Sequence, residues 1–159
     1  MRYTIELIIN QEKINIYSIK IESEEDNEFQ NFLNKFPLDS PYRHDRDVIV
    51  SWILRIAEHG ALERYFRNEG NYNDGVCAIP IEVGQLRLYC LRLSDGCLIV
   101  GNGDIKNTRT WQENPILAPL AKLLIHTAKT IKIRRRKRSI TFNGKDISGN
   151  LNFEYNEEE

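Results

Sequence analysis

The stretch Gly84–Pro115, GQLRLYCLRLSDGCLIVGNGDIKNTRTWQENP, decides the fold of this chain. Two apolar runs flank the sequence Ser94-Asp95-Gly96. Asp-Gly between such runs is a strong hairpin signal, because glycine tolerates the positive φ that tight turns require. The second run leads into a group of cations and hydroxyls, namely Lys106, Thr108, Arg109 and Thr110. We therefore expect basic side chains at fixed places on a rigid sheet.

The first of these runs, LRLYCLRL, has the alternation of a strand. A period of two puts one set of side chains on one face and the next set on the other: Leu86, Leu88 and Cys90 against Arg87, Tyr89 and Leu91. Arg87 and Tyr89 therefore project the same way. A face with Arg and Tyr beside a basic exit loop is typical of a surface that handles a phosphodiester. The alternative is that both are exposed strand residues over a solvated face.

The composition indicates one compact domain with extensions. The chain has 159 residues, of which 41% are hydrophobic and 28% charged, and these are ordinary values for a globular protein. The net charge of -1 conceals an asymmetry, because six cations fall in the seven residues Lys132–Arg138. Acids follow near the end: Asp146, Glu154, Glu157, Glu158 and Glu159. Such a basic arm is expected to contact messenger or ribosomal RNA by counterion release; the alternative is a solubilising helix end.

Cysteine usage and hydropathy predict a cytoplasmic protein. Cys77, Cys90 and Cys97 lie in or beside apolar runs without C-x-x-C spacing, which favours reduced, core-packed thiols over disulfides or a zinc site. The amino-terminal segment is interrupted by polar residues, and no apolar run approaches the length of a membrane span. We expect no metal site, no cofactor and no membrane partner.

The segment before the hairpin predicts two strands and three helices. Residues 3–9 and 14–22 form a hairpin through residues 10–13. The spacing i, i+3, i+4, i+7 predicts an amphipathic helix up to Pro37, with Phe29, Phe32, Leu33 and Phe36 on one side. A second helix begins at a capping Asp45 or Asp47 and ends at Gly60. A short helix follows over residues 61–70.

The remaining segment predicts an antiparallel meander and a terminal helix. Residues 76–83 form its first strand, which Pro80 makes an edge or bulged strand. Gly101 and Gly103 predict a bulge or turn at the end of the last strand, since the segment lacks the frame of a phosphate-binding loop. Asn114-Pro115 begins a helix lined by Leu117, Leu120 and Leu124. Residues 139–155 form a hairpin or an ordered tail.

Four segments carry a resemblance to a known family: Arg87-Leu88-Tyr89, Leu98-Ile99-Val100, the exit segment 105–110 and Pro115. Together with the order of elements, they are similar to the RelE/ParE superfamily of bacterial toxins, and most of all to its HigB-like, phage-derived branch. The resemblance covers roughly residues 14–128. It implies an α+β fold: a RelE-like toxin domain over residues 1–128 with an antiparallel sheet and an extra amino-terminal strand. Residues 129–159 then form a basic arm and a carboxy-terminal hairpin or tail.

The resemblance also implies a type II toxin, a metal-free endoribonuclease that cuts messenger RNA on the ribosome. Its partner is a cognate antitoxin, typically a helix-turn-helix protein. Arg87 takes the place of the family's strand arginine, and Lys106 and Arg109 that of its exit-loop cations. His126 lies where such toxins often carry functional groups and becomes a candidate general base. The chain departs from the pattern at Glu82, where the family usually has a basic residue.

The chemistry of these side chains suits cleavage of RNA without a metal. Guanidinium groups stay charged and bind two phosphate oxygens, so Arg87 and Arg109 are candidate transition-state clamps. Lys106 is a candidate phosphate ligand, acid or base, and Tyr89 a candidate for base stacking or proton transfer. His44 and His59 are expected to be surface or capping residues.

Further candidates for RNA binding lie outside this cluster. Arg64 and Arg67 share one side of the expected short helix, although a solvated face is the alternative. The basic arm contributes Lys132, Arg134, Arg135, Arg136, Lys137 and Arg138. Two other functions remain open: a non-catalytic RNA- or ribosome-binding module, and a phage or defence-related inhibitor of another partner.

Overall fold

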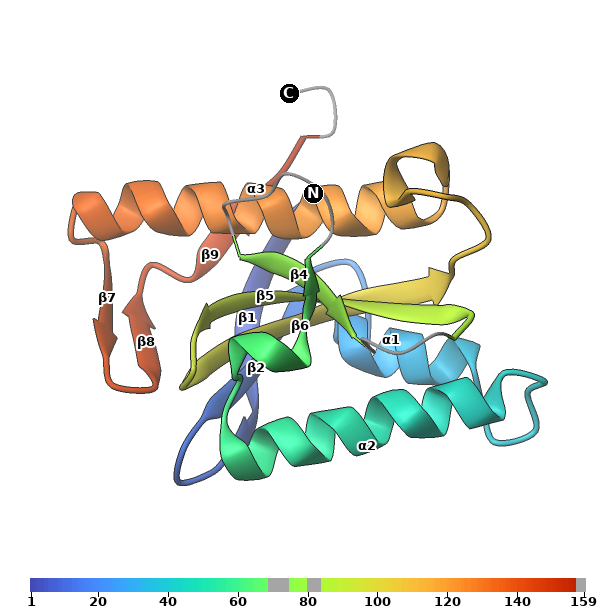
Figure 1. Ribbon diagram of the computed structural model, residues 1–159. Helices are drawn as coiled ribbons and strands as arrows, with labels where there is room; N and C mark the ends of the chain where they lie inside the picture. Colours follow the sequence, from blue (N-terminus) through green and yellow to red (C-terminus); the bar gives the residue numbers. More distant parts are fainter. Residues whose placement is uncertain (69–74, 80–83, 157–159) are drawn as a thin grey trace.

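The computed structural model describes residues 1–68, 75–79 and 84–156, and it shows a mixed sheet between two helical layers (Figure 1). In chain order the elements are β1 (Arg2–Asn10), β2 (Asn15–Ile21), α1 (Glu28–Lys35), α2 (Arg43–His59), the 3₁₀ turn η1 (Glu63–Tyr65), β3 (Arg67–Asn68), β4 (Val76–Ile79), β5 (Leu86–Ser94), β6 (Cys97–Ile105), the 3₁₀ turn η2 (Trp111–Glu113), α3 (Leu117–Arg136), β7 (Ile140–Asn143), β8 (Asp146–Gly149) and β9 (Asn152–Glu154). The α+β class is as expected.

The large sheet has the strand order β3-β4-β5-β6-β2-β1-β9. Its hairpins, β1–β2 and the meander β4–β5–β6, pair antiparallel as predicted. The sheet is mixed where an antiparallel sheet was expected, because β2 and β6 run parallel, with Tyr17 opposite Ile99. Parallel neighbours require a long crossover, and here the chain between them passes through α1, α2 and the rest of the meander.

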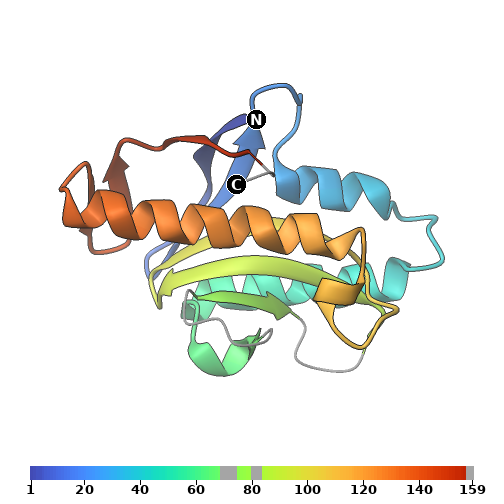
Figure 2. The same cartoon turned by 90° about the horizontal axis from the view of Figure 1, so that it is seen from above.

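Helices cover both faces of this sheet (Figure 2). One core lies between the sheet and α3 and includes Tyr89 and Leu91. The other lies on the side of α1 and α2 and includes Leu88 and Cys90. The two cores confirm the predicted alternation of β5.

All three cysteines are buried and outside disulfide bonds, as predicted. Cys77 and Cys90 pack in the core beside α1 and α2, and Cys97 in the core beside α3. Burial raises the pKa of Cys97 to about 12 and that of Cys90 well above its usual range. The thiols of Cys90 and Cys97 therefore stay protonated near neutral pH.

The predicted irregularity at the end of β6 is present. The register of β5 and β6 shifts between Leu88 and Cys90. Gly103 lies so close to the partner strand that a Cβ atom there would come within 1.9 Å of the carbonyl oxygen of Arg87. Only glycine fits this bulge. Pro80 falls outside the described residues.

The two helices beneath the sheet begin differently. Asn27 caps α1, since its side-chain oxygen accepts the N–H of Gln30 at 2.8 Å. Neither aspartate caps α2, whose N-cap is Tyr42. The carboxylate of Asp45 instead accepts the N–H of Gln85 at 2.7 Å and so fixes the start of β5. The predicted cap is therefore wrong, because a tertiary partner holds this carboxylate.

Residues 61–68 do not form the expected short helix, and residues 69 and 70 fall outside the described part of the chain. Within residues 61–68 there is one 3₁₀ turn, and Arg67 then begins β3, which pairs with β4. The third helix begins at Leu117 with Ile116 as its N-cap, two residues after the predicted start at Pro115, although the side-chain oxygen of Asn114 accepts the N–H of Ile116 at 2.9 Å. It continues without a break through residues 128 and 129 to Arg136, so the basic run forms its last turns.

The segment after α3 returns to the sheet. The predicted hairpin is present as β7–β8, and β9 then pairs with β1 at the edge of the sheet. Met1 and Tyr155 extend this pairing, because each donates its nitrogen's hydrogen to the other's carbonyl oxygen, at 3.0 and 2.8 Å. The two ends of the described chain therefore lie side by side.

Candidate nucleic-acid interface

Arg87 and Tyr89 project from β5 towards α3, but that face of the sheet is not open. Tyr89 is 0% exposed and Arg87 is 6% exposed. One guanidinium nitrogen of Arg87 donates to the carbonyl oxygens of Gly84 and Leu86, at 2.7 and 3.0 Å. The expected Arg-Tyr surface is therefore wrong, because α3 needs to bury its own apolar side and covers this face. Tyr89 cannot stack on an RNA base in this arrangement.

Lys106 and Arg109 lie in the loop between β6 and η2. Arg109 is exposed and Lys106 half-buried. The loop is held by its own hydrogen bonds: Thr108 Oγ1 donates to the carbonyl oxygen of Thr110 at 2.6 Å, and Asn114 Nδ2 to Asn107 Oδ1 at 3.2 Å. These two predicted cations therefore share one ordered loop just before α3.

His126 lies elsewhere on α3, beside Tyr3 of β1 and Tyr155 of the terminal segment. Its ring lies 4.7 Å from that of Tyr155 and 6.5 Å from that of Tyr3, between centroids. Burial raises the pKa of Tyr3 to about 12, and its hydroxyl shares a 2.7 Å hydrogen bond with Thr127. His126 therefore forms an aromatic contact with Tyr155. It lies nine residues, or about 13 Å along the helix axis, after Leu117, the first residue of α3.

The other predicted basic-aromatic unit does not form as expected. Arg64 is exposed, with its guanidinium 5.3 Å from the ring of Tyr65. Arg67 belongs to β3, and only its backbone is described. The shared helical face of these two residues is absent because the chain leaves η1 directly for a strand.

Two arginines of the basic arm contact the carboxy-terminal segment, and five of the arm's six cations are exposed. Arg134 Nη1 donates to the carbonyl oxygens of Asn150 and Asn152, at 2.9 and 2.5 Å. Arg135 lies over the ring of Phe142, 4.7 Å from its centroid. These two arginines hold the carboxy-terminal segment against α3. Arg135 is also exposed, as are the other four cations of the arm: Lys132, Arg136, Lys137 and Arg138.

Exposed cations continue along the outer face of α3. Lys122, Lys129, Lys132 and Arg136 stand at i, i+7, i+10 and i+14, and all four are exposed. At 100° per residue they fall within an arc of about 80° and span about 21 Å of the helix. We call these four residues the α3 stripe. Lys122 and Lys129 are absent from the sequence-based set, although their helical spacing to Lys132 and Arg136 is a signal that finds them.

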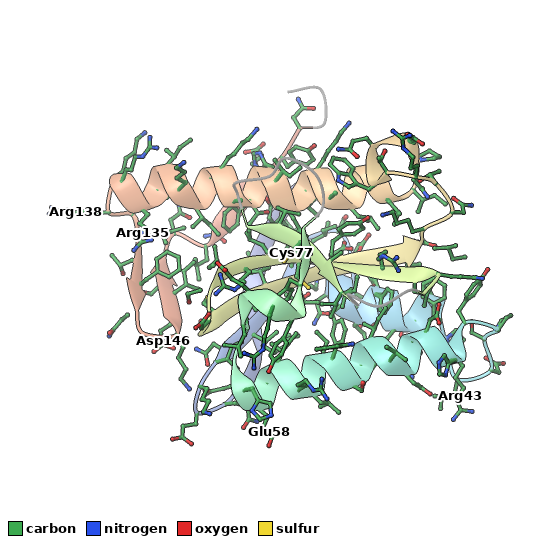
Figure 3. All side chains as sticks on the ribbon, viewed as in Figure 1. Arg43, Glu58, Cys77, Arg135, Arg138 and Asp146 are labelled. Atoms are coloured by element: carbon green, nitrogen blue, oxygen red, sulfur yellow. The ribbon has the colours of Figure 1, made fainter. Side chains whose placement is uncertain are left out.

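No acid interrupts this surface along the chain. The sequence from Asn114 to Lys145 contains no Asp or Glu and nine cations, which are Lys122, Lys129, Lys132, Arg134, Arg135, Arg136, Lys137, Arg138 and Lys145. Arg135 and Arg138 mark the end of α3 beside the β7–β8 hairpin (Figure 3). The loop of Lys106 and Arg109 precedes the opposite end of this helix, which is 20 residues and about 30 Å long. The structure does not bring the two cationic groups together.

A hollow of about 710 Å³ lies over β1, β2 and β9. Arg2, Lys20 and Arg134 line it together with Glu22 and Glu154. Cations and acids are nearly balanced there, so it does not concentrate positive charge as the α3 stripe does.

No family model, curated protein or solved structure matches this chain. Within residues 1–68, 75–79 and 84–156, no cluster of three or more His, Cys, Asp and Glu side chains is placed to hold a metal ion. No helix in the described part of the chain has the length and apolar character needed to cross a bilayer.

Proposed function

We propose that this protein is an RNA-binding module whose contact surface is the α3 stripe with Lys137 and Arg138 beside it. One observation carries this proposal: exposed cations line one face of a long helix, with no acid anywhere in that part of the chain. Phosphate groups attract such a face, and each one bound releases a counterion. The ammonium groups of lysines, which sit on flexible side chains, suit contacts to the phosphate backbone of RNA that do not depend on base sequence.

The helix dipole alone does not account for the stripe. Cations are favoured within the last turn of a helix, which covers Arg136 but not Lys122 or Lys129, two to four turns earlier. A merely solubilising surface usually carries charges of both signs. The one-sided sign of this helix therefore favours an anionic polymer as the partner.

We also propose that the fold is RelE-like. The order β2, α1, α2, the meander β4–β5–β6 and α3 supports this proposal, because it is the order on which the resemblance rests. A cytoplasmic location is proposed with it, supported by three buried thiols outside disulfide bonds.

The second candidate function is a ribosome-dependent endoribonuclease held inactive by an antitoxin. The loop of Lys106 and Arg109 favours it, since it presents an exposed guanidinium on an ordered turn. The burial of Arg87 and Tyr89 counts against the endoribonuclease, because both side chains would have to face the RNA substrate. Binding is therefore placed ahead of cleavage.

Binding of a fluorescent oligoribonucleotide, measured by anisotropy over a series of salt concentrations, tests the proposal. The triple variant Lys122→Gln, Lys129→Gln, Lys132→Gln is compared with Lys13→Gln, Arg43→Gln, Arg55→Gln, which removes the same charge from other exposed positions. The stripe variant should bind the RNA more weakly. The slope of log K against log salt concentration should be smaller in magnitude by about 2, because each of the three lost phosphate contacts contributes about 0.7 to it. Equal slopes for wild type and the stripe variant would contradict the proposal.

A further inference from the structure

An aromatic pair lies between the first two cations of the α3 stripe. His126 follows Lys122 by four residues and precedes Lys129 by three, so all three share one helical face. The ring of Tyr155 packs on that of His126, with centroids 4.7 Å apart and planes at 38°. Both side chains are half-buried, while Lys122 and Lys129 are exposed.

Two hydrogen bonds to Met1 hold the backbone of Tyr155 in place. Its backbone nitrogen donates to the carbonyl oxygen of Met1 at 2.8 Å, and its carbonyl oxygen accepts from the terminal ammonium of Met1 at 3.0 Å. Behind this pair, the rings of Tyr3 and Phe153 stack at 5.1 Å with planes 8° apart. The pair thus rests on an ordered aromatic layer, and little freedom is lost when another flat ring contacts it.

We propose that the α3 stripe takes single-stranded RNA, with a base against the His126–Tyr155 pair and the flanking phosphates on Lys122 and Lys129. This inference rests on the proposed function and names its substrate class. A duplex hides the faces of its bases and offers the stripe only phosphates, whereas a single strand also offers rings that stack. An aromatic platform between cations gains binding free energy both from the phosphates and from the stacked base.

The test compares ligands and variants in one anisotropy assay. The ligands are a fluorescent oligouridylate, an abasic oligomer with the same number of phosphates, and an RNA duplex of equal length. The variants are Tyr155→Leu, which removes the ring, and Tyr155→Phe, which keeps it. Tyr42→Leu is the matched control, because Tyr42 is also half-buried but belongs to the opposite layer, where its ring meets that of Phe36.

For wild type, we expect the oligouridylate to bind about tenfold more tightly than the abasic oligomer and the duplex. Tyr155→Leu should bind the oligouridylate and the abasic oligomer equally, while Tyr155→Phe and Tyr42→Leu should behave like wild type. Thermal melts of each variant show that it is folded.

Two results would overturn the inference and leave the proposed function standing. In the first, wild type binds all three ligands equally with a steep salt dependence. In the second, Tyr155→Leu is folded and keeps the full preference for bases. Absence of salt-dependent binding to any of the ligands would remove the proposed function itself, and the inference with it.

Discussion

Arg134 lies over the ring of Phe153, with its Cζ atom 4.8 Å from the ring centroid. The same guanidinium donates to the carbonyl oxygens of Asn150 and Asn152. It therefore joins the last turns of α3 to the edge strand β9, which in turn pairs with β1. Three contacts from one side chain close the carboxy-terminal segment onto the sheet.

Arg134→Ala should lower the free energy of unfolding by about 1–3 kcal/mol, because two hydrogen bonds and a cation–π contact are lost. Arg136→Ala is the matched control and should change it by less than about 0.5 kcal/mol, since Arg136 is exposed on the same helix. Urea unfolding followed by circular dichroism measures both. A loss no greater for Arg134 than for Arg136 would show that the anchor contributes nothing.

Arg87→Ala should destabilise the fold by about 2 kcal/mol, because it deprives the carbonyl oxygens of Gly84 and Leu86 of a donor and leaves a space in place of a buried side chain. Arg109→Ala should leave stability nearly unchanged, as this side chain is exposed. Thermal melts compare the two. If Arg87→Ala has the same melting temperature as wild type, then Arg87 is not the structural residue that its burial indicates.

Glu28→Gln should flatten the dependence of stability on pH. Glu28, the first residue of α1, is buried, and its Oε2 accepts from Asn102 Nδ2 at 2.6 Å. Burial raises the pKa of this carboxyl above its usual value of 4.5 in the folded protein. The folded state therefore binds the proton more tightly than the unfolded chain. Its stabilising contribution is complete below pH 4.5 and is lost as the pH rises through the folded value.

Melting temperatures of wild type and Glu28→Gln, recorded from pH 4 upwards, measure this effect. Wild type should lose stability relative to the variant over that range. Glu25→Gln serves as the control, because Glu25 is exposed. Parallel curves for wild type and Glu28→Gln would mean that this carboxyl titrates alike in the folded and unfolded chain.

The endoribonuclease candidate predicts that expression of the protein alone arrests growth. It also predicts cleavage of messenger RNA on ribosomes and little cleavage of naked RNA, because the ribosome must order the substrate. Arg109→Ala should then reduce cleavage by about two to three powers of ten, and Lys106→Ala should lower the rate as well. Arg55→Ala, an exposed arginine of α2, is the control. Normal growth of cells that contain the folded wild-type protein would exclude this candidate.

Local signals in the sequence determined most of the elements. The Asp-Gly turn, the alternation of residues 86–91, the bulge glycines and the apolar spacing of α1 and α3 each act within a few residues. Such preferences are carried by φ/ψ restrictions and by the periods of strand and helix, so they need no partner. The same locality holds for the α3 stripe, whose helical spacing can be read from the residues alone.

Only the tertiary structure decided what covers each face. The alternation placed Arg87 and Tyr89 together, but α3, about thirty residues later, turned their face into core. The parallel pairing of β2 with β6, the attachment of Asp45 to β5 and the anchoring of Arg134 on β9 likewise join segments far apart in the chain. Local patterns fix which side chains share a surface, whereas long-range packing fixes whether water, another layer or a ligand meets it.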